Sequence, residues 1–291
     1  MPKTKSIGII GGTGFYDIPG IEWIDERTID TPFGSPSDTY KIGTMDELMI
    51  IFLPRHGRDH TILPSEINAR ANIYGMKSLG VEWLLTTSAV GTFREDLPPQ
   101  EIVIVDQFVD RTKKGNRHTF FGNGIIAHIS FSHPVCNELS SLVYQAGKEV
   151  TDRIHHGGTY LNIEGPAFST RAESILYKSW GMDVIGMTSI VEAKLAREAE
   201  ICFTTLAIVT DYDSWHEDLE VVSTTGVLEN FNKSVATARK IVEATLQQFN
   251  LERNCGCKDA LRDALLTDVQ TLPREKMNKF GVLLEKYLPN K

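Results

Sequence analysis

Two carboxylates at the end of one apolar segment, Asp211 and Asp213, have the types and spacing for acid–base chemistry. They follow the run 203–210, whose composition indicates a buried strand. In an extended chain, residues i and i+2 point the same way, so an extended continuation would turn both carboxylates towards one pocket. An Asp-x-Asp pair alone is more often a turn than a catalytic pair, so the interpretation depends on other features.

A glycine cluster after the first apolar segment offers a second kind of chemistry, anion binding. Gly11, Gly12 and Gly14 surround Thr13. Glycines let backbone N–H groups approach an anion closely, and a threonine hydroxyl can add a donor. A tight turn without a ligand and a dinucleotide-binding loop are the alternatives. The dinucleotide loop fits poorly, because the spacing is not G-x-G-x-x-G and the Pro-Gly pair at 19–20 breaks the helix that should follow.

Three more polar turns follow apolar runs. The segment 55–60 holds two arginines and two histidines, and a guanidinium offers a planar fork of donors that suits an oxyanion. The segment 86–92 is rich in hydroxyl groups, and Thr188 and Ser189 follow the run that ends at Gly186. Each turn alone could be a solvated polar loop. Four strand ends that each offer phosphate donors together indicate an anion site.

An aromatic side chain follows a further apolar run. Gly165 and Pro166 force a turn there, which would present Phe168 at the edge of a sheet. An exposed aromatic face can stack on a planar base. The alternative is that Phe168 belongs to the core.

Strands and helices must bring these residues together. Most apolar runs are continuous rather than alternating, which is typical of strands buried on both faces. The predicted strands cover residues 6–10, 48–53, 82–87, 101–109, 159–163, 183–187 and 203–210. Helical patterns lie at 67–79, at 227–246 behind a cap at Ser223 or Thr224, and at 277–288. The alternation predicts a single α/β domain over residues 1–291, with a mixed, mostly parallel central sheet flanked by helices and with ligands at the carboxyl ends of strands.

Composition narrows the classes of function. The formal net charge is −8 and 41% of residues are hydrophobic, which suits a globular protein with a core and does not favour nucleic-acid binding. No run approaches the roughly 18–20 apolar residues that cross a bilayer, and the N-terminal segment is too short for a signal peptide. A cytoplasmic protein is expected. No metal site is expected from the eight histidines, since no two fall at helix-face spacing with a carboxylate.

The four cysteines leave two interpretations open. Cys136 and Cys202 have apolar neighbours and suit small buried side chains. Cys255 and Cys257 are one residue apart, a pair that cannot bind zinc alone, and the sequence offers no Cys-x-x-Cys or paired histidines to complete a site. Free thiols are one interpretation, and a redox pair or structural disulfides are the other.

Taken together, the motifs resemble those of the 5′-methylthioadenosine phosphorylases, in the trimeric branch of the purine nucleoside phosphorylases. The shared motifs are the glycine turn, P-R-H-G-R-x-H-T at 54–61, S-A-x-G at 88–91, E-G-P-x-F-S-x-R-A-E at 164–173, M-T at 187–188 and T-D-Y-D-x-W at 210–215. They occur in order between about residue 6 and residue 235, and the remaining C-terminal part matches loosely.

The resemblance implies phosphate-dependent cleavage of methylthioadenosine to adenine and 5-methylthioribose 1-phosphate, a step of purine and methionine salvage. Inorganic phosphate would be a co-substrate, with no cofactor and no metal. The expected phosphate contacts are Thr13, Arg55, His56, Ser88, Ala89 and Thr188. A homo-oligomer, either a trimer or a dimer of trimers, is expected.

The resemblance also assigns the residues around the nucleoside. Phe168 would stack on the base with Ser169 beside it, and Met187 would lie under the ribose. Asp211 and Asp213 would contact N7 and the 6-amino group, and His128 would reach the 5′ end from a neighbouring subunit. A C-terminal helical segment at about 265–291 would close over the site, where Phe280, Val282 and Leu283 could form an apolar 5′ pocket.

The residues that differ between branches point to a 6-aminopurine. The 6-oxopurine branch has Asn where this chain has Asp211, and Glu where it has Ser169. An aspartate accepts a hydrogen bond from an exocyclic amine, whereas asparagine is the better partner for a carbonyl. Two departures are Ser88 in place of Thr and Val191 in place of Pro. A broader-specificity or 6-oxopurine nucleoside phosphorylase is the nearest alternative; a nicotinamide-dependent oxidoreductase and a non-catalytic nucleoside-binding protein are more distant ones.

The resemblance suggests a separate role for each of the two carboxyl groups. The departing purine gains electron density at N7, so a protonated carboxyl group there would help. Burial beside a second carboxylate raises a carboxyl pKa above its usual value near 3.9. We expect Asp211 to carry the proton and Asp213 to orient it or to contact the 6-amino group.

Overall fold

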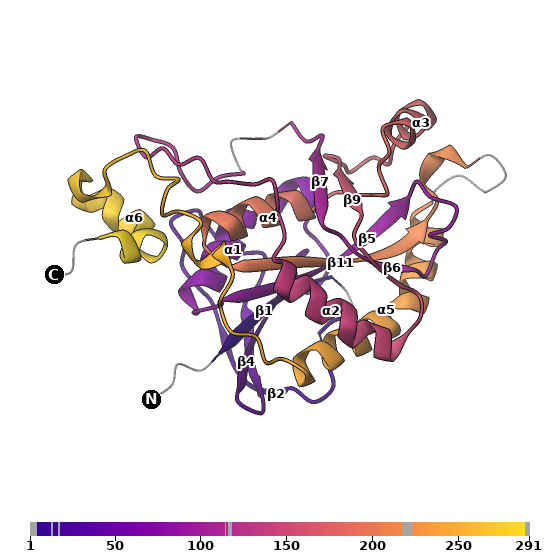
Figure 1. Cartoon of the computed structure of the whole chain (residues 1–291), viewed down its shortest axis with the longest axis horizontal. Coiled ribbons are helices and arrows are strands. Elements are labelled where there is room, and N and C mark those ends of the chain that lie inside the picture. Colours follow the sequence, from indigo (N-terminus) through magenta and orange to yellow (C-terminus); the bar gives the residue numbers. More distant parts are fainter. Residues whose placement is uncertain are drawn as a thin grey trace.

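The structure is a computed structural model, and it describes residues 5–12, 14–16, 18–113, 115, 118–216 and 223–288. In this part of the chain, eleven strands form one sheet (Figure 1). The strands are β1 (Ser6–Gly11), β2 (Glu22–Arg27), β3 (Tyr40–Met45), β4 (Leu48–Pro54), β5 (Trp83–Thr92), β6 (Ile102–Ile104), β7 (Gln107–Asp110), β8 (Ile154–His156), β9 (Thr159–Asn162), β10 (Val184–Gly186) and β11 (Cys202–Asp211). The α-helices are α1 (Ala69–Ser78), α2 (Asn137–Val150), α3 (Arg171–Ser179), α4 (Ser189–Glu198), α5 (Thr224–Gln247) and α6 (Arg274–Leu284).

The sheet is mixed and mostly parallel, which confirms the predicted α/β class. Parallel pairs join β4 to β1, β1 to β5 and β5 to β11 at its centre. Antiparallel pairs join β2 to β3, β3 to β4, β5 to β10 and β6 to β11. The carboxyl ends of the central parallel strands therefore meet at one edge, where the polar turns were predicted to gather.

Strand β5 is the point at which the sheet forks. Its first part, residues 83–86, pairs with β1, whereas Gly91 and Thr92 pair with β10 on that edge. On the other edge, β11 follows β5 from Trp83 to Gly91. The stretch 87–90 lies between the pairings with β1 and β10, so one edge of the strand opens there.

Two apolar cores lie on opposite faces of the sheet. Alternate residues of β4 point to opposite sides, so Ile51 packs with α1, α4 and α6, and Phe52 packs with α2 and α5. Figure 1 shows α2 and α5 together on one side, with α6 at one end of the molecule. This double burial explains why the strand sequences are continuously apolar.

Some predicted elements differ from the structure. The predicted strand at 101–109 is wrong as one strand, because β6 pairs with β11 and β8 whereas β7 pairs with β9. Strands β2, β3 and β8 were not predicted. Strand β2, with the sequence EWIDER, is exposed along most of its length, and β8 is only three residues long. Neither carries the apolar run on which the prediction relied.

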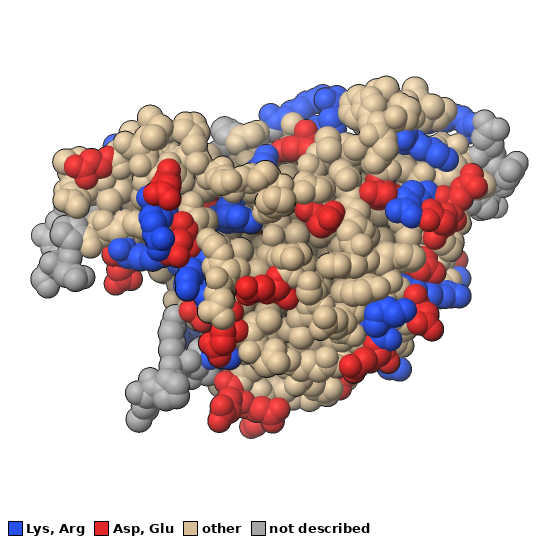
Figure 2. Space-filling model, viewed as in Figure 1, with Lys and Arg blue, Asp and Glu red and all other residues tan. Residues whose placement is uncertain are grey.

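Acidic and basic side chains are intermixed on the face of the molecule shown in Figure 2. Among the described residues, no helix has the length and apolar character needed to span a membrane.

Candidate active site

A cavity of about 690 Å³ opens at the fork of the sheet. Its size falls within the range of ligand pockets, about 300–1,000 Å³. Its walls are the ends of strands (residues 12, 55–56, 87–91, 185–188, 210, 211 and 213), loop residues 60–64, 163, 168 and 169, and α5 residues 224, 227, 228, 231 and 232. Segments far apart in the sequence thus meet where β5 lacks a neighbour on one edge.

Most of the predicted site residues line this cavity. They are Arg55, His56, Ser88, Ala89, Phe168, Ser169, Met187, Thr188, Asp211 and Asp213. Thr13 lies outside the described residues. His128 is exposed and away from the cavity of its own chain, and its backbone N–H donates to the carbonyl oxygen of Ala264 at 2.8 Å.

Asp211 and Asp213 lie at one end of the cavity. Strand alternation predicted this for an extended chain, in which residues i and i+2 point the same way, but the backbone there is not extended. Strand β11 ends at Asp211, and Asp213 begins a 3₁₀ turn with a φ of 47°. Asp211 Oδ1 accepts the backbone N–H of Asp213 at 2.9 Å, which closes the turn. The register with β5 also shifts between Val209 and Asp211. A bulge and a turn, rather than an extended chain, aim both side chains into the cavity.

Burial raises the pKa of both carboxyl groups. For Asp211, desolvation is the main cause, opposed by hydrogen bonds from the Thr210 hydroxyl and the Asp213 N–H. For Asp213, desolvation again dominates; the Ser174 hydroxyl, whose Oγ lies 2.5 Å from Oδ2, opposes it, and the charge of Asp211 adds to it. The pair therefore holds a proton more readily than exposed aspartates do.

The hydroxyl of Thr210 contacts two acceptors. Its Oγ1 is 3.1 Å from the Val90 carbonyl oxygen and 2.8 Å from Asp211 Oδ2. A hydroxyl has one hydrogen to donate, and a carbonyl can only accept. Thr210 therefore shares its one hydrogen between the Val90 carbonyl and Asp211 Oδ2, and its bond to Asp211 opposes the rise in the pKa of that carboxyl group.

Phe168 presents its ring to the cavity and does not belong to the core, since 41% of its surface is exposed. The segment around it is fixed. Thr170 caps α3, with its Oγ1 accepting the N–H of Glu173 at 3.2 Å. The hydroxyl of Ser214 donates to the carbonyl of Ser169 at 2.9 Å. The aromatic face is thus held open beside the carboxylates.

The opposite end of the cavity holds a buried ion pair. Arg55 and Glu192 are 2% and 1% exposed. Their contact is bidentate, with Nε 2.6 Å from Oε1 and Nη2 2.9 Å from Oε2. Arg55 Nη1 also donates to the carbonyl of Thr87 at 2.7 Å. These bonds fix the plane of the guanidinium, and the pair as a whole carries no net charge.

His56 sits beside this pair in one defined tautomer. Its Nδ1 lies 2.8 Å from the carbonyl oxygen of Ile62, which can only accept, so Nδ1 carries the hydrogen. Burial and then the charge of Arg55 lower the pKa of His56 to about 4. The ring is therefore neutral at pH 7, and its Nε2 is an acceptor.

Hydroxyls and a helix end complete this side of the cavity. The hydroxyl oxygen of Ser88 lies 3.0 Å from that of Tyr160. Thr188, which precedes the first turn of α4, lines the cavity, so the N-terminus of that helix lies beside it. The exposed N–H groups of a helix N-terminus attract anions. This end is suited to an oxyanion and the other to a hydrogen-bonding aromatic base.

The remaining wall is apolar and comes from α5. Val227, Leu228 and Phe231 line the cavity, and the predicted cap at Ser223 is confirmed by its hydrogen bond from the N–H of Gly226 at 3.1 Å. Within one chain, no described residue of 265–288 lines the cavity. Helix α6 packs its apolar residues Phe280, Leu283 and Leu284 into the core near α1. Closure of the site by the C-terminal segment stays a prediction about an oligomer.

Sequence reasoning gave no role to two positioning residues. Glu192 was not predicted as a site residue, although a glutamate within an apolar helix face is a signal of a buried acid that needs a partner. Ser174, which holds Asp213, carried no such signal, because the two are 39 residues apart in the chain.

Comparison with known proteins relates this arrangement to one family. The chain matches the model of the phosphorylase superfamily over residues 6–247. It is 49% identical to the S-methyl-5′-thioadenosine phosphorylase of Geobacter sulfurreducens, across 97% of this chain and 99% of the bacterial protein. A crystal structure of a methylthioadenosine phosphorylase from an Antarctic soil metagenomic library matches with a TM-score of 0.90 and 40% identity, covering 97% of this chain and 100% of that one. The Schistosoma mansoni methylthioadenosine phosphorylase in complex with adenine matches with a TM-score of 0.83 and 36% identity, covering 89% and 96%.

Proposed function

The chain belongs to the methylthioadenosine phosphorylases of the phosphorylase superfamily, and on that premise we propose that it cleaves 5′-methylthioadenosine with inorganic phosphate. The products are adenine and 5-methylthioribose 1-phosphate, which makes the chain a pentosyltransferase of purine and methionine salvage. One observation carries the proposal: a single cavity joins an oxyanion-suited end, at Arg55 and α4, to a base-suited end at Phe168 and the two aspartates.

Phosphate binds at the Arg55 end. Four of the five guanidinium N–H groups point to Glu192, Thr87 and Ile10, which leaves one hydrogen on Nη1 for a phosphate oxygen. The acceptor Nε2 of His56 suits the remaining P–OH of monohydrogen phosphate. The Ser88 hydroxyl and the N-terminus of α4 supply further donors. These groups hold the phosphate in place for attack, so no side-chain nucleophile is needed.

The reaction transfers the pentose from nitrogen to oxygen. A phosphate oxygen forms the new bond to C1′ while the bond from C1′ to N9 breaks, and the bonding electron pair leaves with the purine. Asp211 delivers its proton to N7, which neutralises the departing base. Burial raises the pKa of this carboxyl group, which favours its protonated form.

The second carboxylate selects the base. Ser174 donates to Oδ2 of Asp213, which holds this group as an acceptor that can also take a hydrogen bond from a 6-amino group. A 6-oxo group would place a carbonyl oxygen against that carboxylate, and neither has a hydrogen to donate. Phe168 stacks on the ring and Met187 lies beneath the ribose.

The 5′ end of the nucleoside lies along the apolar α5 wall. A methylthio group gains from contact with Val227, Leu228 and Phe231, whereas a 5′-hydroxyl loses hydrogen bonds to water there. We propose that His128, exposed in one chain, reaches the 5′ end of a neighbour's substrate in a trimer or a dimer of trimers. A cytoplasmic location is part of the same proposal.

The test is a product assay on methylthioadenosine, adenosine and inosine, each with and without phosphate. We expect adenine release only with phosphate, fastest from methylthioadenosine and slowest from inosine. Faster turnover of inosine would identify a 6-oxopurine phosphorylase instead. Adenine release without phosphate would contradict phosphorolysis, and tight binding without product would indicate a nucleoside-binding protein.

A further inference from the structure

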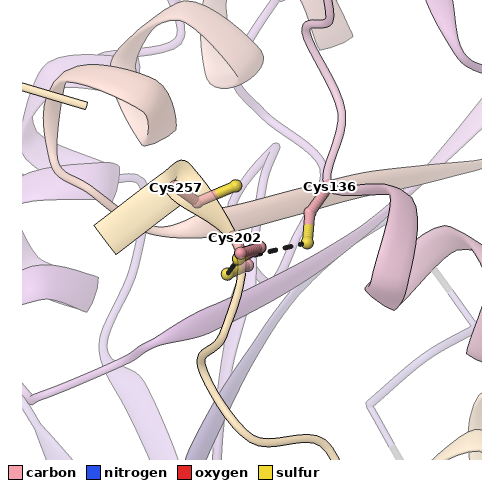
Figure 3. Close-up of side chains that lie close together, drawn as sticks. Cys136, Cys202 and Cys257 are labelled. Atoms are coloured by element: carbon pink, nitrogen blue, oxygen red, sulfur yellow. Dashed lines mark hydrogen bonds between the residues drawn. The ribbon is translucent and has the colours of Figure 1, made fainter. Parts of the chain in front are cut away.

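The four cysteines of the chain meet at one point outside the active site. Cys136 precedes α2, Cys202 begins β11, and Cys255 and Cys257 lie at the start of a 3₁₀ turn (Gly256–Asp259) in the C-terminal segment. All four sulfur atoms lie within 4.8 Å of one another. Figure 3 shows Cys136, Cys202 and Cys257 approaching a common centre from three separate elements.

The spacing of the sulfur atoms suits a tetrahedral metal ion. The Sγ of Cys255 lies 3.3 Å from that of Cys202 and 3.8 Å from that of Cys136. Four thiolates about 2.3 Å from a central zinc ion stand about 3.8 Å from one another, because that is the edge of the tetrahedron. A disulfide needs the two sulfur atoms about 2.05 Å apart. The cluster is thus arranged around a centre rather than as two pairs.

We propose that Cys136, Cys202, Cys255 and Cys257 bind one structural Zn²⁺ ion. On binding, the four thiols release four protons and form four zinc–sulfur bonds, with no oxidation or reduction. A four-thiolate set is the ligand set of closed structural zinc sites, with no position open for substrate. Cys136, Cys202 and Cys257 are buried, whereas Cys255 is partly exposed and offers the path of entry.

This site revises the expectation of no metal that the sequence supported. Cys255 and Cys257 cannot complete a zinc site by themselves, and their partners precede them by more than fifty residues. Only the packing of the C-terminal segment against β11 and α2 brings the two pairs together.

The zinc ion would fasten the C-terminal segment to the α/β domain. The superfamily model ends at residue 247, so Cys255 and Cys257 lie beyond it and their two partners within it. A few residues later, the segment pairs with the loop that carries His128: Ala127 forms a bridge with Leu265, and Leu266 N–H donates to the Ile126 carbonyl at 2.9 Å. Loss of the ion would loosen this segment and the loop beside it.

Metal content and thiol accessibility test the proposal without any assay of activity. The full chain is purified under a metal-free reductant, and its metals are measured by plasma mass spectrometry. We expect about one zinc per chain, released together with four reactive thiols when the protein is unfolded with a chromogenic chelator. A metal-free sample is reduced and titrated with Zn²⁺ and with Co²⁺; Co²⁺ is expected to give the charge-transfer and visible bands of a tetrahedral thiolate site.

Cys202→Ser and Cys257→Ser remove one ligand each and should lose the zinc. The matched control is Ala238→Ser, which places a similar hydroxyl in the same apolar core and removes no thiol. We expect the control to keep about one zinc per chain. Each cysteine variant should melt roughly 5–10 °C below the control. If these variants do not fold, the Co²⁺ titration of the unaltered chain decides.

Three results would overturn the proposal. Reduced chain that takes up neither Zn²⁺ nor Co²⁺ would show that the thiols are simply free. Fewer than four thiols before reduction, with the mass loss of disulfides, would assign the cluster to cross-links. Iron in place of zinc in the purified chain would overturn the choice of metal.

Discussion

The two ends of the active-site cavity manage buried charge in opposite ways. At the phosphate end, Arg55 is matched by Glu192 before any ligand arrives, and His56 is neutral. At the base end, Asp211 and Asp213 take hydrogen bonds from hydroxyl and backbone groups, and burial raises the pKa of each. At the first end, Glu192 neutralises the charge of Arg55, so an anion would bind there through directed hydrogen-bond donors. At the other end, burial favours the protonated form of the carboxyl groups, as the proposed protonation of a departing purine requires.

The largest expected effect is at the base end. Asp211→Asn removes the proton donor while keeping the shape of the side chain, so kcat/KM for methylthioadenosine should fall about 1,000-fold. The KM for phosphate should stay close to that of the unaltered protein, because the variant leaves the other end intact. Steady-state kinetics with each substrate varied in turn measures both. Full turnover by this variant would remove Asp211 from the chemistry.

The next effect is at the phosphate end and concerns stability. Glu192→Gln leaves the buried guanidinium of Arg55 without its counter-charge, so the free energy of unfolding should fall by roughly 3 kcal/mol. Glu198→Gln is the matched control on the same helix. Burial raises the pKa of Glu198 to about 7, and its partners are the Thr119 hydroxyl and the Phe120 N–H rather than a cation. Chemical denaturation should show the smaller loss for the control; equal losses would contradict a special role for the ion pair.

A smaller effect is expected from acid. The pKa of His56 is about 4 in the folded chain and near 6.5 when unfolded, so the unfolded chain binds more protons between these values. The contribution of His56 to stability therefore falls as pH drops from 6.5 to 4 and is constant above 6.5. His56→Gln should remove roughly 2–3 kcal/mol of the acid destabilisation at pH 4.5, measured by denaturation across pH. An unchanged acid dependence would mean that His56 is not the group that titrates.

The smallest effect tests a single hydroxyl at the phosphate end. Ser88→Ala should raise the KM for phosphate about 5–10-fold, the value of one lost hydrogen bond. Tyr160→Phe is the control, because it removes the Tyr160 hydroxyl that contacts Ser88 but keeps the Ser88 hydroxyl. A similar rise in both variants would assign the effect to the Ser88–Tyr160 contact rather than to phosphate.

The sequence predicted the part of the molecule that depends on local pattern. Continuous apolar runs identified the buried strands, and polar turns after them identified most of the cavity, because the carboxyl ends of parallel strands converge. Strand β2 was missed because it is exposed and charged. Asp213 was predicted to face a pocket because of strand alternation. It lines the cavity because of a 3₁₀ turn instead, which only the structure shows. The partnership of Arg55 with Glu192 and the cysteine cluster depend on contacts between distant segments, which spacing in one sequence does not contain.

In the proposed reaction, strand β5 also sets the distance between the phosphate and the departing purine. Residues 87–91 of this strand serve both ends: the Thr87 carbonyl holds Arg55, Ser88 lines the cavity, the Val90 carbonyl accepts from Thr210, and Gly91 leaves room for the Asp211 carboxylate. At about 3.3 Å per residue, the step from Ser88 to Gly91 spans roughly 10 Å. One strand would thus fix the spacing between the nucleophile and the leaving group. Insertion of one residue into this strand would lengthen that spacing and turn every following side chain of the strand to the opposite face.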